Sequence, residues 1–184
     1  MRTKLSGKKV VIFGGAGFIG SHLVKCLCKE SCQINIVSRN PKSTPPLFFA
    51  NDPGQIKFKK ISSFNQKEID SQVEGSDVVF NLIGILSESK SSKFDFVHSK
   101  IPEMIATSVR NKKVRNFIHV SALNVNKIKT STYALSKYLG ESIVSEIFPN
   151  SLIIRPGVVF GKGDNFTNFF SFLSKFSPVL PMIG

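Results

Sequence analysis

The sequence is short of acidic residues and of long apolar runs. Its 184 residues include 12 Asp and Glu against 25 Lys and Arg, a formal net charge of +13. This excess favours anionic partners such as nucleotide phosphates, nucleic acid or an acidic membrane surface, without choosing among them. No apolar run approaches the roughly 18 residues that a membrane helix needs, so we expect no transmembrane segment. The 41% of hydrophobic residues exclude a disordered tail and fit one globular domain.

Cysteine is also scarce, and the three cysteines, Cys26, Cys28 and Cys32, lie in one short segment. An odd number so close together argues against a disulfide framework and for a reducing compartment. His22 and Cys26 have the spacing of a helical metal-ligand pair, but the second pair points elsewhere on the helix, so we expect helix packing and no metal site. The apolar face expected for this helix consists of Ile19, Leu23, Cys26 and Leu27.

Short apolar runs alternate with amphipathic segments along the chain. The runs predicted as strands are Val10–Phe13, Ile34–Val37, Ile56–Ile61, Asp77–Ile83, Asn116–Ser121 and Ser151–Arg155. The segments predicted as helices are Phe18–Lys29, Gln66–Val73, Lys93–Asn111 and Thr132–Ile147. Strands that alternate with helices form right-handed βαβ units. The fold class is therefore predicted to be α/β, with a Rossmann-type, doubly wound parallel sheet.

A glycine-rich loop follows the first predicted strand directly. Gly14, Gly17 and Gly20 have the spacing that permits a tight turn, a close approach of the backbone to a pyrophosphate, and close packing of helix on strand. The free N–H groups at the start of the next helix would bind phosphate oxygens. We therefore expect a dinucleotide to contact these glycines together with Phe18 and Ile19. A tight turn without any ligand is the alternative.

The end of the second predicted strand indicates which dinucleotide is preferred. An acidic residue there would bind both ribose hydroxyls and favour NAD. The sequence instead has Ser38 and Arg39, a hydroxyl and a guanidinium that suit a 2′-phosphate. NADP is therefore the predicted cofactor, and NAD is possible. In the alternative interpretation, Arg39 is a solvated loop residue.

Tyr133 and Lys137 are four residues apart on a predicted helix, which places a phenol and an ammonium on one face. A nearby cation lowers the pKa of a phenol, which can then act as a general acid or base beside a nicotinamide. The pair is common by chance, but it gains meaning from the glycine loop and the predicted strand that precede it. Both residues are predicted to contact the cofactor and to be catalytic.

Together these motifs resemble the short-chain dehydrogenase/reductase superfamily, in its extended or atypical branch of NAD-dependent epimerase/dehydratase-like proteins. The stretches that carry the resemblance are Gly14–Gly20, Asp77–Gly84, Phe117–Ser121, Tyr133–Lys137 and Leu152–Gly161. The chain is more closely similar to the dehydrogenase-like accessory subunits of respiratory complex I and their bacterial relatives. The stretches behind that similarity are Asn81–Leu86, Phe94–His98, His119–Leu123 and Ser177–Gly184. The resemblance implies that Asn81, Gly84 and Pro156 also contact the cofactor.

The chain departs from the active members of this superfamily at several positions. Ala122 stands where they carry the hydroxyl that binds a substrate carbonyl. Ser121 is a substitute donor or merely a residue at the end of a strand, and the second interpretation is slightly favoured. The structural Asn of the superfamily aligns with His98, for which a hydrogen-bonded helix histidine is at least as good an interpretation as a catalytic one. Residues 59–62 lack the Asp that usually contacts adenine.

The last part of the sequence is apolar and rich in phenylalanine. Its phenylalanines are Phe160, Phe166, Phe169, Phe170, Phe172 and Phe176. We expect residues 1–157 to form a dinucleotide-binding Rossmann domain and residues 158–184 to begin an incomplete C-terminal substrate or docking region, because such proteins normally continue beyond this length. A largely apolar helix face there is predicted to contact a protein partner.

Three functions are compatible with these features. In the first, the cofactor is structural and the protein is an accessory subunit or assembly factor of a membrane-associated respiratory complex. It would be cytoplasmic, or in the mitochondrial matrix of a eukaryote, and peripheral to the inner membrane. The second is an active NADP-dependent reductase or epimerase that uses Tyr133, Lys137 and Ser121. The third, a regulatory or nucleic-acid-binding protein, is the weakest, because basic motifs interleaved with aromatic residues are missing and nucleic acid is not expected as a partner.

Overall fold

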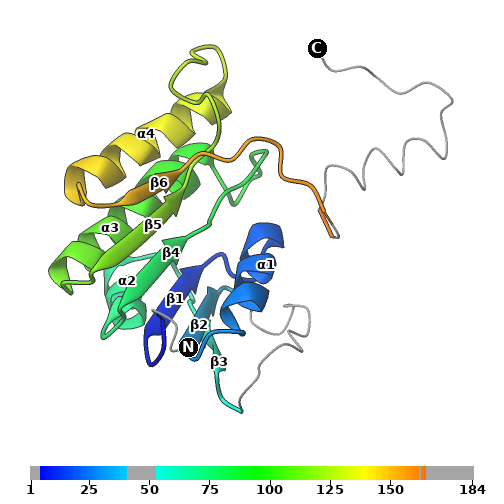
Figure 1. The fold of residues 1–184 in the computed structure, drawn as a ribbon. Helices are drawn as coiled ribbons and strands as arrows, with labels where there is room; N and C mark the ends of the chain where they lie inside the picture. Colours follow the sequence, from blue (N-terminus) through cyan, green and yellow to red (C-terminus); the bar gives the residue numbers. More distant parts are fainter. Residues whose placement is uncertain (1–4, 41–52, 162, 165–184) are drawn as a thin grey trace, which may run out of the picture.

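The computed structural model describes residues 5–40, 53–161 and 163–164. Within these residues a single sheet of six parallel strands has the order β3-β2-β1-β4-β5-β6 (Figure 1). The strands are β1 Lys9–Phe13, β2 Gln33–Ser38, β3 Ile56–Lys60, β4 Val78–Asn81, β5 Asn116–Val120 and β6 Leu152–Ile154. The helices are α1 Phe18–Leu27, α2 Gln66–Val73, the π-helix η2 Phe96–Lys100, α3 Ile101–Asn111 and α4 Thr132–Ile147. The prediction of a Rossmann-type parallel sheet is confirmed.

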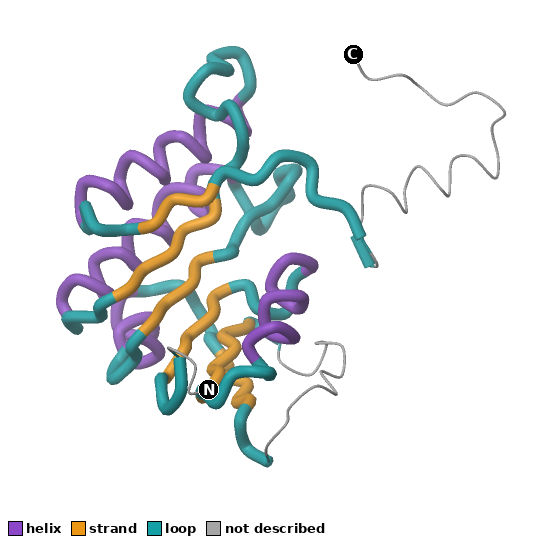
Figure 2. The backbone as a smooth tube through the Cα atoms, viewed as in Figure 1, coloured by secondary structure: helices purple, strands orange, loops and turns teal. Residues whose placement is uncertain are grey.

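The helices cover the sheet in two layers, with α2, α3 and α4 on one face and α1 on the other (Figures 1 and 2). Each layer has its own apolar core. Val11, Phe13 and Phe117 pack under α2, α3 and α4, whereas Ile12 and Ile36 pack under α1. The central strand β1 is buried on both faces from Val10 to Phe13, as expected for a parallel sheet. Because the strands are parallel, their carboxyl ends meet at one edge, where a ligand site is expected.

Two of the predicted helices differ in detail from the observed ones. The predicted helix Lys93–Asn111 begins with the π-helical turn η2, whose wider turn accommodates the close approach of α4 described below. In α1 the residues facing the sheet are Gly20, Val24 and Leu27, so the predicted apolar face was rotated. The reason is that Gly20 must lie against the glycine turn, which leaves Ile19 partly exposed.

The three cysteines are free thiols, which agrees with the expected absence of a disulfide framework. Cys28 and Cys32 are buried under α1, but Cys26 is exposed and does not pack in the core as predicted. In the described ranges, no three potential metal ligands of the His, Cys, Asp or Glu type lie together. No helix in that part of the chain is both long and apolar enough to cross a membrane.

Most of the Phe-rich stretch lies outside the described residues, and so does the apolar helix face predicted within it. Of its phenylalanines only Phe160 is described, and its side chain is 73% exposed. The proposed boundary between residues 1–157 and 158–184 therefore stays a prediction. The sheet face of β6 on the side of α1 is also open, since Leu152 and Ile154 are exposed.

Candidate functional site

Two adjoining cavities lie at the carboxyl ends of the central strands. The first, here called the β2 cavity, has a volume of about 250 Å³ and reaches the end of β2. The second, the α4 cavity, has a volume of about 610 Å³ and reaches the start of α4. Gly14, Gly17 and residues 82–85 line both of them. The two cavities thus form one groove, with the glycine turn at its middle.

The glycine turn is held by contacts that allow no side chain. Gly14 has a φ of 81°, and a Cβ on it would lie 2.9 Å from the carbonyl carbon of Leu82. A Cβ on Gly20 would lie 2.3 Å from the carbonyl oxygen of Gly14. A Cβ on Gly17 would come no closer than 3.3 Å to any neighbour. Of the three glycines, Gly17 is therefore the one that packing within the protein constrains least. Gly17 is the N-cap of α1, and no side chain caps the helix. Its first N–H groups are therefore available to an anion.

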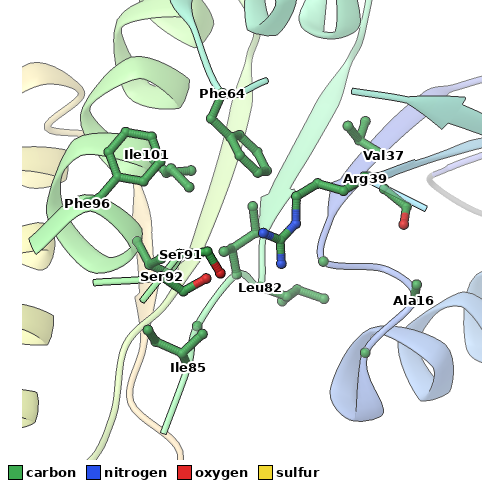
Figure 3. Close-up of a pocket in the computed structure, with 16 residues that line it drawn as sticks. Ala16, Val37, Arg39, Phe64, Leu82, Ile85, Ser91, Ser92, Phe96 and Ile101 are labelled. Carbon is green, nitrogen blue, oxygen red and sulfur yellow. The ribbon is translucent and has the colours of Figure 1, made fainter. Parts of the chain in front are cut away.

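The β2 cavity contains both residues predicted to distinguish NADP from NAD. Ser38 and Arg39 line it, and the Arg39 side chain extends across the cavity above Leu82 (Figure 3). In the described part of the chain, Arg39 makes no ion pair and no carboxylate lines this cavity. A bound phosphate would therefore find an uncompensated guanidinium. Figure 3 also shows Phe64 on one side of this guanidinium, at a place where an aromatic ring or a base could pack.

The α4 cavity contains the predicted Tyr133 and Lys137. Lys137 is 5% exposed, and its Nζ donates a hydrogen bond to the carbonyl of Val120 at 2.8 Å. Burial lowers the pKa of this ammonium to about 8. Tyr133 is half-buried, and burial raises the pKa of its phenol. The sequence argument expected the cation to lower that pKa; the direction is the opposite, because burial disfavours the charged phenolate.

His98 connects the loop after β4 to α4. Its Nε2 accepts a hydrogen bond from the backbone N–H of Ile85 at 3.1 Å, so the ring proton is on Nδ1, which donates to the Ser136 hydroxyl at 2.8 Å. The ring also stacks on Phe94 and meets Tyr133 edge-on. Burial lowers the pKa of His98 to about 4, so the ring is neutral. This geometry supports the hydrogen-bonded helix histidine over the catalytic interpretation.

Gly140 is a site residue that the sequence analysis missed. It lies on the buried face of α4, and a Cβ there would come 1.7 Å from the carbonyl oxygen of His98. Only glycine therefore lets α4 approach η2 closely enough for Ser136 to meet the His98 ring. Glycine inside a helix costs about 1 kcal/mol relative to alanine, so its mid-helix position was the signal that could have identified it.

Asn81 was predicted to contact the cofactor, but it lines neither cavity. Its side chain is fully buried, its Oδ1 accepts a hydrogen bond from the N–H of Ile83, and its Nδ2 donates to Nδ1 of His119 at 3.1 Å. Burial lowers the pKa of His119 to about 3, which keeps that ring neutral. Asn81 thus shapes the shared wall of the cavities from behind.

Ser121 lines the α4 cavity, and its buried hydroxyl has no hydrogen-bond partner among the described residues, although it contributes to lowering the pKa of the Glu141 carboxyl. The Arg155 guanidinium is the main cause of this lowering, because it forms a two-pronged ion pair with Glu141, in which Nε lies 3.0 Å from Oε2. Sequence analysis missed this pair, since its members are on different elements. Ala122 lines the cavity and offers no hydroxyl.

The remaining predicted cofactor residues lie in the groove. Phe18, Ile19, Gly84 and Pro156 line the α4 cavity, and Gly84 lines the β2 cavity as well. The outer wall of the α4 cavity is apolar and open to solvent; its large exposed side chains are Leu86, Leu123, Ile128, Val158 and Val159. Among the described residues that line this cavity, Lys137 alone is charged.

The curated relatives that resemble this chain include respiratory subunits and a reductase. It is 35% identical over 171 residues to NADH dehydrogenase (ubiquinone) 1 alpha subcomplex subunit 9 of Mus musculus, covering 92% of this chain and 45% of that protein. It is 33% identical to the NADH-ubiquinone oxidoreductase 40 kDa subunit of Neurospora crassa, covering 89% and 44%. It is 29% identical to the ceramide reductase of Caulobacter vibrioides, covering 95% and 54%. The chain spans about half the length of these relatives.

Among solved structures, Pen from Bacillus thuringiensis has a TM-score of 0.80 at 19% identity, covering 94% of this chain and 59% of that one. The UDP-glucuronic acid 4-epimerase from Bacillus cereus in complex with NAD has a TM-score of 0.67 at 22% identity, covering 83% and 58%. Such identities show a common fold. The profile of the NAD dependent epimerase/dehydratase family matches residues 10–178. With nearly the whole sequence matched and the glycine turn, the six parallel strands and the Tyr–Lys pair in place, the chain belongs to the NAD dependent epimerase/dehydratase family.

Proposed function

We propose that the chain binds a nicotinamide dinucleotide along the groove and acts as an accessory subunit or assembly factor of a membrane-associated respiratory complex. The observation that carries the binding proposal is the uncapped start of α1 at Gly17, which opens on both cavities at once. A pyrophosphate at this helix start would leave one nucleoside in each cavity. The similarity to respiratory subunits supports the accessory role.

Each half of the dinucleotide has its own set of residues in this proposal. Gly14, Gly17 and Gly20, with Phe18 and Ile19, hold the pyrophosphate through the backbone. Ser38 and Arg39 contact the adenosine ribose and its 2′-phosphate. Gly84, Pro156, Tyr133 and Lys137 surround the nicotinamide. When reduced, the bound dinucleotide would supply a hydride. In an accessory subunit it would instead stabilise the groove, without turnover.

Preference for NADP rests on Arg39, and calorimetry with NADPH and NADH tests it. NADPH should bind more tightly, and Arg39→Ala should weaken NADPH binding about tenfold, or ~1.4 kcal/mol, while leaving NADH unaffected. Arg110→Ala, an exposed arginine of α3, is the matched control. Tighter binding of NADH would overturn the preference. Gly17→Asp should abolish the binding of both, because its carboxylate would occupy the phosphate position.

The composition of the α4 cavity supports a structural cofactor. Ala122 lines this cavity where active relatives carry a hydroxyl, and it cannot polarise a carbonyl. Loss of such a donor raises a barrier by about 3 kcal/mol or more. Turnover of free carbonyl compounds with NADPH should therefore be weak or absent in a reductase screen. Strong activity that depends on Tyr133 would contradict this part of the proposal.

The second candidate function is an active NADP-dependent reductase or epimerase, and one observation favours it. Tyr133, Lys137 and Ser121 all line the α4 cavity, whose outer wall is apolar and which has no further charged residue among those the structure describes. Such a wall suits a neutral carbonyl compound with an aliphatic chain. Oxidation of NADPH with a long-chain ketone that is lost in Tyr133→Phe would support it. The control is Tyr138→Phe, which changes the other tyrosine of α4, itself 43% exposed.

The accessory role predicts where the protein is found. It should migrate with a membrane respiratory complex on native gels and be released by alkaline carbonate, as a peripheral protein is. In a eukaryote this would be the matrix side of the inner mitochondrial membrane. A protein that remains wholly separate from every respiratory complex would contradict the assignment. The proposed contact is the Phe-rich stretch within residues 158–184, and Phe169→Glu with Phe170→Glu should disrupt co-migration without abolishing NADPH binding.

A further inference from the structure

A third cavity lies outside the groove, between α2 and the strands β1, β2 and β3. Its volume is about 400 Å³, and none of its lining residues belongs to the β2 or α4 cavity. We call it the lysine pocket and define it by Lys9, Gln33, Asn35, Lys57, Lys59 and Gln72, which line it. Lys9 and Gln33 begin their strands, so the pocket lies toward the amino ends of β1 and β2, away from the glycine turn.

The floor of the lysine pocket is polar where a parallel sheet is normally apolar. Side chains alternate along a strand, so Lys9, Val11 and Phe13 lie on one face of β1. Val11 and Phe13 are buried under the helices, whereas Lys9 meets Gln33 across the strand pair. Asn35 pairs in the same way with Lys57. The amino-terminal half of this face therefore presents ammonium and carboxamide groups, beside an apolar core at the other half.

The lysines of the pocket are not paired with acids inside it. No carboxylate of the described residues lines it, and neither Lys57 nor Lys59 makes an ion pair with any of them. Lys9 donates its Nζ to the backbone carbonyl of Glu74 at 2.6 Å, while the carboxylate of Glu74 pairs with Lys112 outside the pocket. Asn35 is only 6% exposed, so a polar amide is held at the bottom of the hollow.

We propose that the lysine pocket binds a phosphate-bearing polar group, either a small phosphate ester or the headgroup of an acidic lipid. Ammonium and carboxamide N–H groups are donors that phosphate oxygens accept from, and charged donors make the stronger bonds. Lysines on β3, an edge strand, also discourage edge-to-edge aggregation. That role needs only exposed charge, and it explains neither the amides on the neighbouring strand nor the concave shape.

An NMR titration of the whole chain with inorganic pyrophosphate tests the site, because each backbone amide reports on its own neighbourhood. Saturable shifts should appear at Gln33, Asn35 and Lys57, separately from any at the glycine turn. The Lys57→Gln/Lys59→Gln variant should weaken them about tenfold. Lys60→Gln is the matched control, because it removes a neighbouring charge from the same strand but from the opposite face. The proposal would be overturned if no shifts appeared at these residues, or if Lys60→Gln weakened them as much as the double variant does.

Sedimentation with vesicles distinguishes the two sources of phosphate. If the group is a lipid headgroup, the chain should sediment with phosphatidic acid vesicles more than with phosphatidylcholine vesicles. The double variant should lose this co-sedimentation, and Lys60→Gln should retain it. Pyrophosphate shifts without sedimentation would assign the pocket to a soluble phosphate ester. Sedimentation that is the same in all variants, with no shifts at the pocket, would overturn it. Circular dichroism of each variant checks that it is folded; the single variant Lys59→Gln serves if the double one is not.

Discussion

The two ends of the groove are built by different means. At the β2 end the shape depends on the backbone of Gly14, which tolerates no side chain and lies against Gly20, and no buried residue of β1, β2 or β3 is charged or a histidine. At the α4 end several buried side chains are ionisable: His98, His119, Lys137 and Glu141. The first end should therefore respond to substitutions that add a Cβ and hardly to pH, and the second should respond strongly to pH.

Gly140 is an exception to this contrast, because it is a position at the α4 end where the packing of the backbone excludes a side chain. Gly140→Ala should destabilise the protein by more than about 3 kcal/mol or prevent folding, since the new Cβ would overlap the carbonyl oxygen of His98. Urea unfolding measures the effect. Gly157→Ala is the control, because its nearest neighbour would be 3.6 Å away. Equal stability of the two variants would show that α4 can move away from η2.

Acid should unfold the α4 end first. The pKa values of His98 and His119 fall to about 4 and about 3 in the folded state, below the usual value of 6.5. The unfolded chain therefore binds more protons as pH falls below 6.5, and each histidine lowers stability by about 1.4 kcal/mol per pH unit until its folded pKa is reached. Urea midpoints between pH 7 and pH 4 should show this. His98→Gln and His119→Gln variants that keep the full slope would refute the assignment.

The sequence predicted the β2 end better than the α4 end, and the reason is distance along the chain. The glycine turn, the parallel strands and the place of Arg39 at the end of β2 follow from local patterns within βαβ units. By contrast, His98 lies 38 residues from Ser136, and Asn81 lies 38 residues from His119. Nothing local predicts that these groups meet. The direction of the Tyr133 pKa was wrong for a related reason, since burial by Phe94 and His98 cannot be read from Tyr–Lys spacing.

The ion pair between Glu141 and Arg155 should have a moderate effect at the α4 end. Arg155→Ala leaves a carboxylate that is only 6% exposed without its main partner, at a cost of about 2 kcal/mol, less than for a fully buried pair because Arg155 is 44% exposed. Thermal unfolding at neutral pH measures it. The double variant Glu141→Gln/Arg155→Gln, which removes both charges, should recover part of the lost stability. A loss in the double variant larger than in Arg155→Ala would contradict an unpaired carboxylate as the cause.

Lys137 should give the smallest effect, and it concerns binding. Its pKa of about 8 means that the ammonium is lost as pH rises from 7 to 9. Dinucleotide affinity should fall about threefold to tenfold over this range, as a positive charge disappears from the nicotinamide end. Calorimetry at the two pH values measures it, and Lys137→Met should remove the dependence. A dependence that survives Lys137→Met but disappears in Arg39→Ala would move the effect to the β2 end.

Because both tyrosines lie in α4, intrinsic tyrosine fluorescence reports on this helix. The sequence has no tryptophan and two tyrosines, Tyr133 and Tyr138, both within α4. Tyr133 faces His98 edge-on at the cavity, while Tyr138 is 43% exposed. Near-ultraviolet fluorescence of the whole chain is therefore a signal from one helix, beside the place proposed for the nicotinamide. With Tyr138→Phe, that signal would come from a single ring, and the unlabelled protein would report on its own binding site.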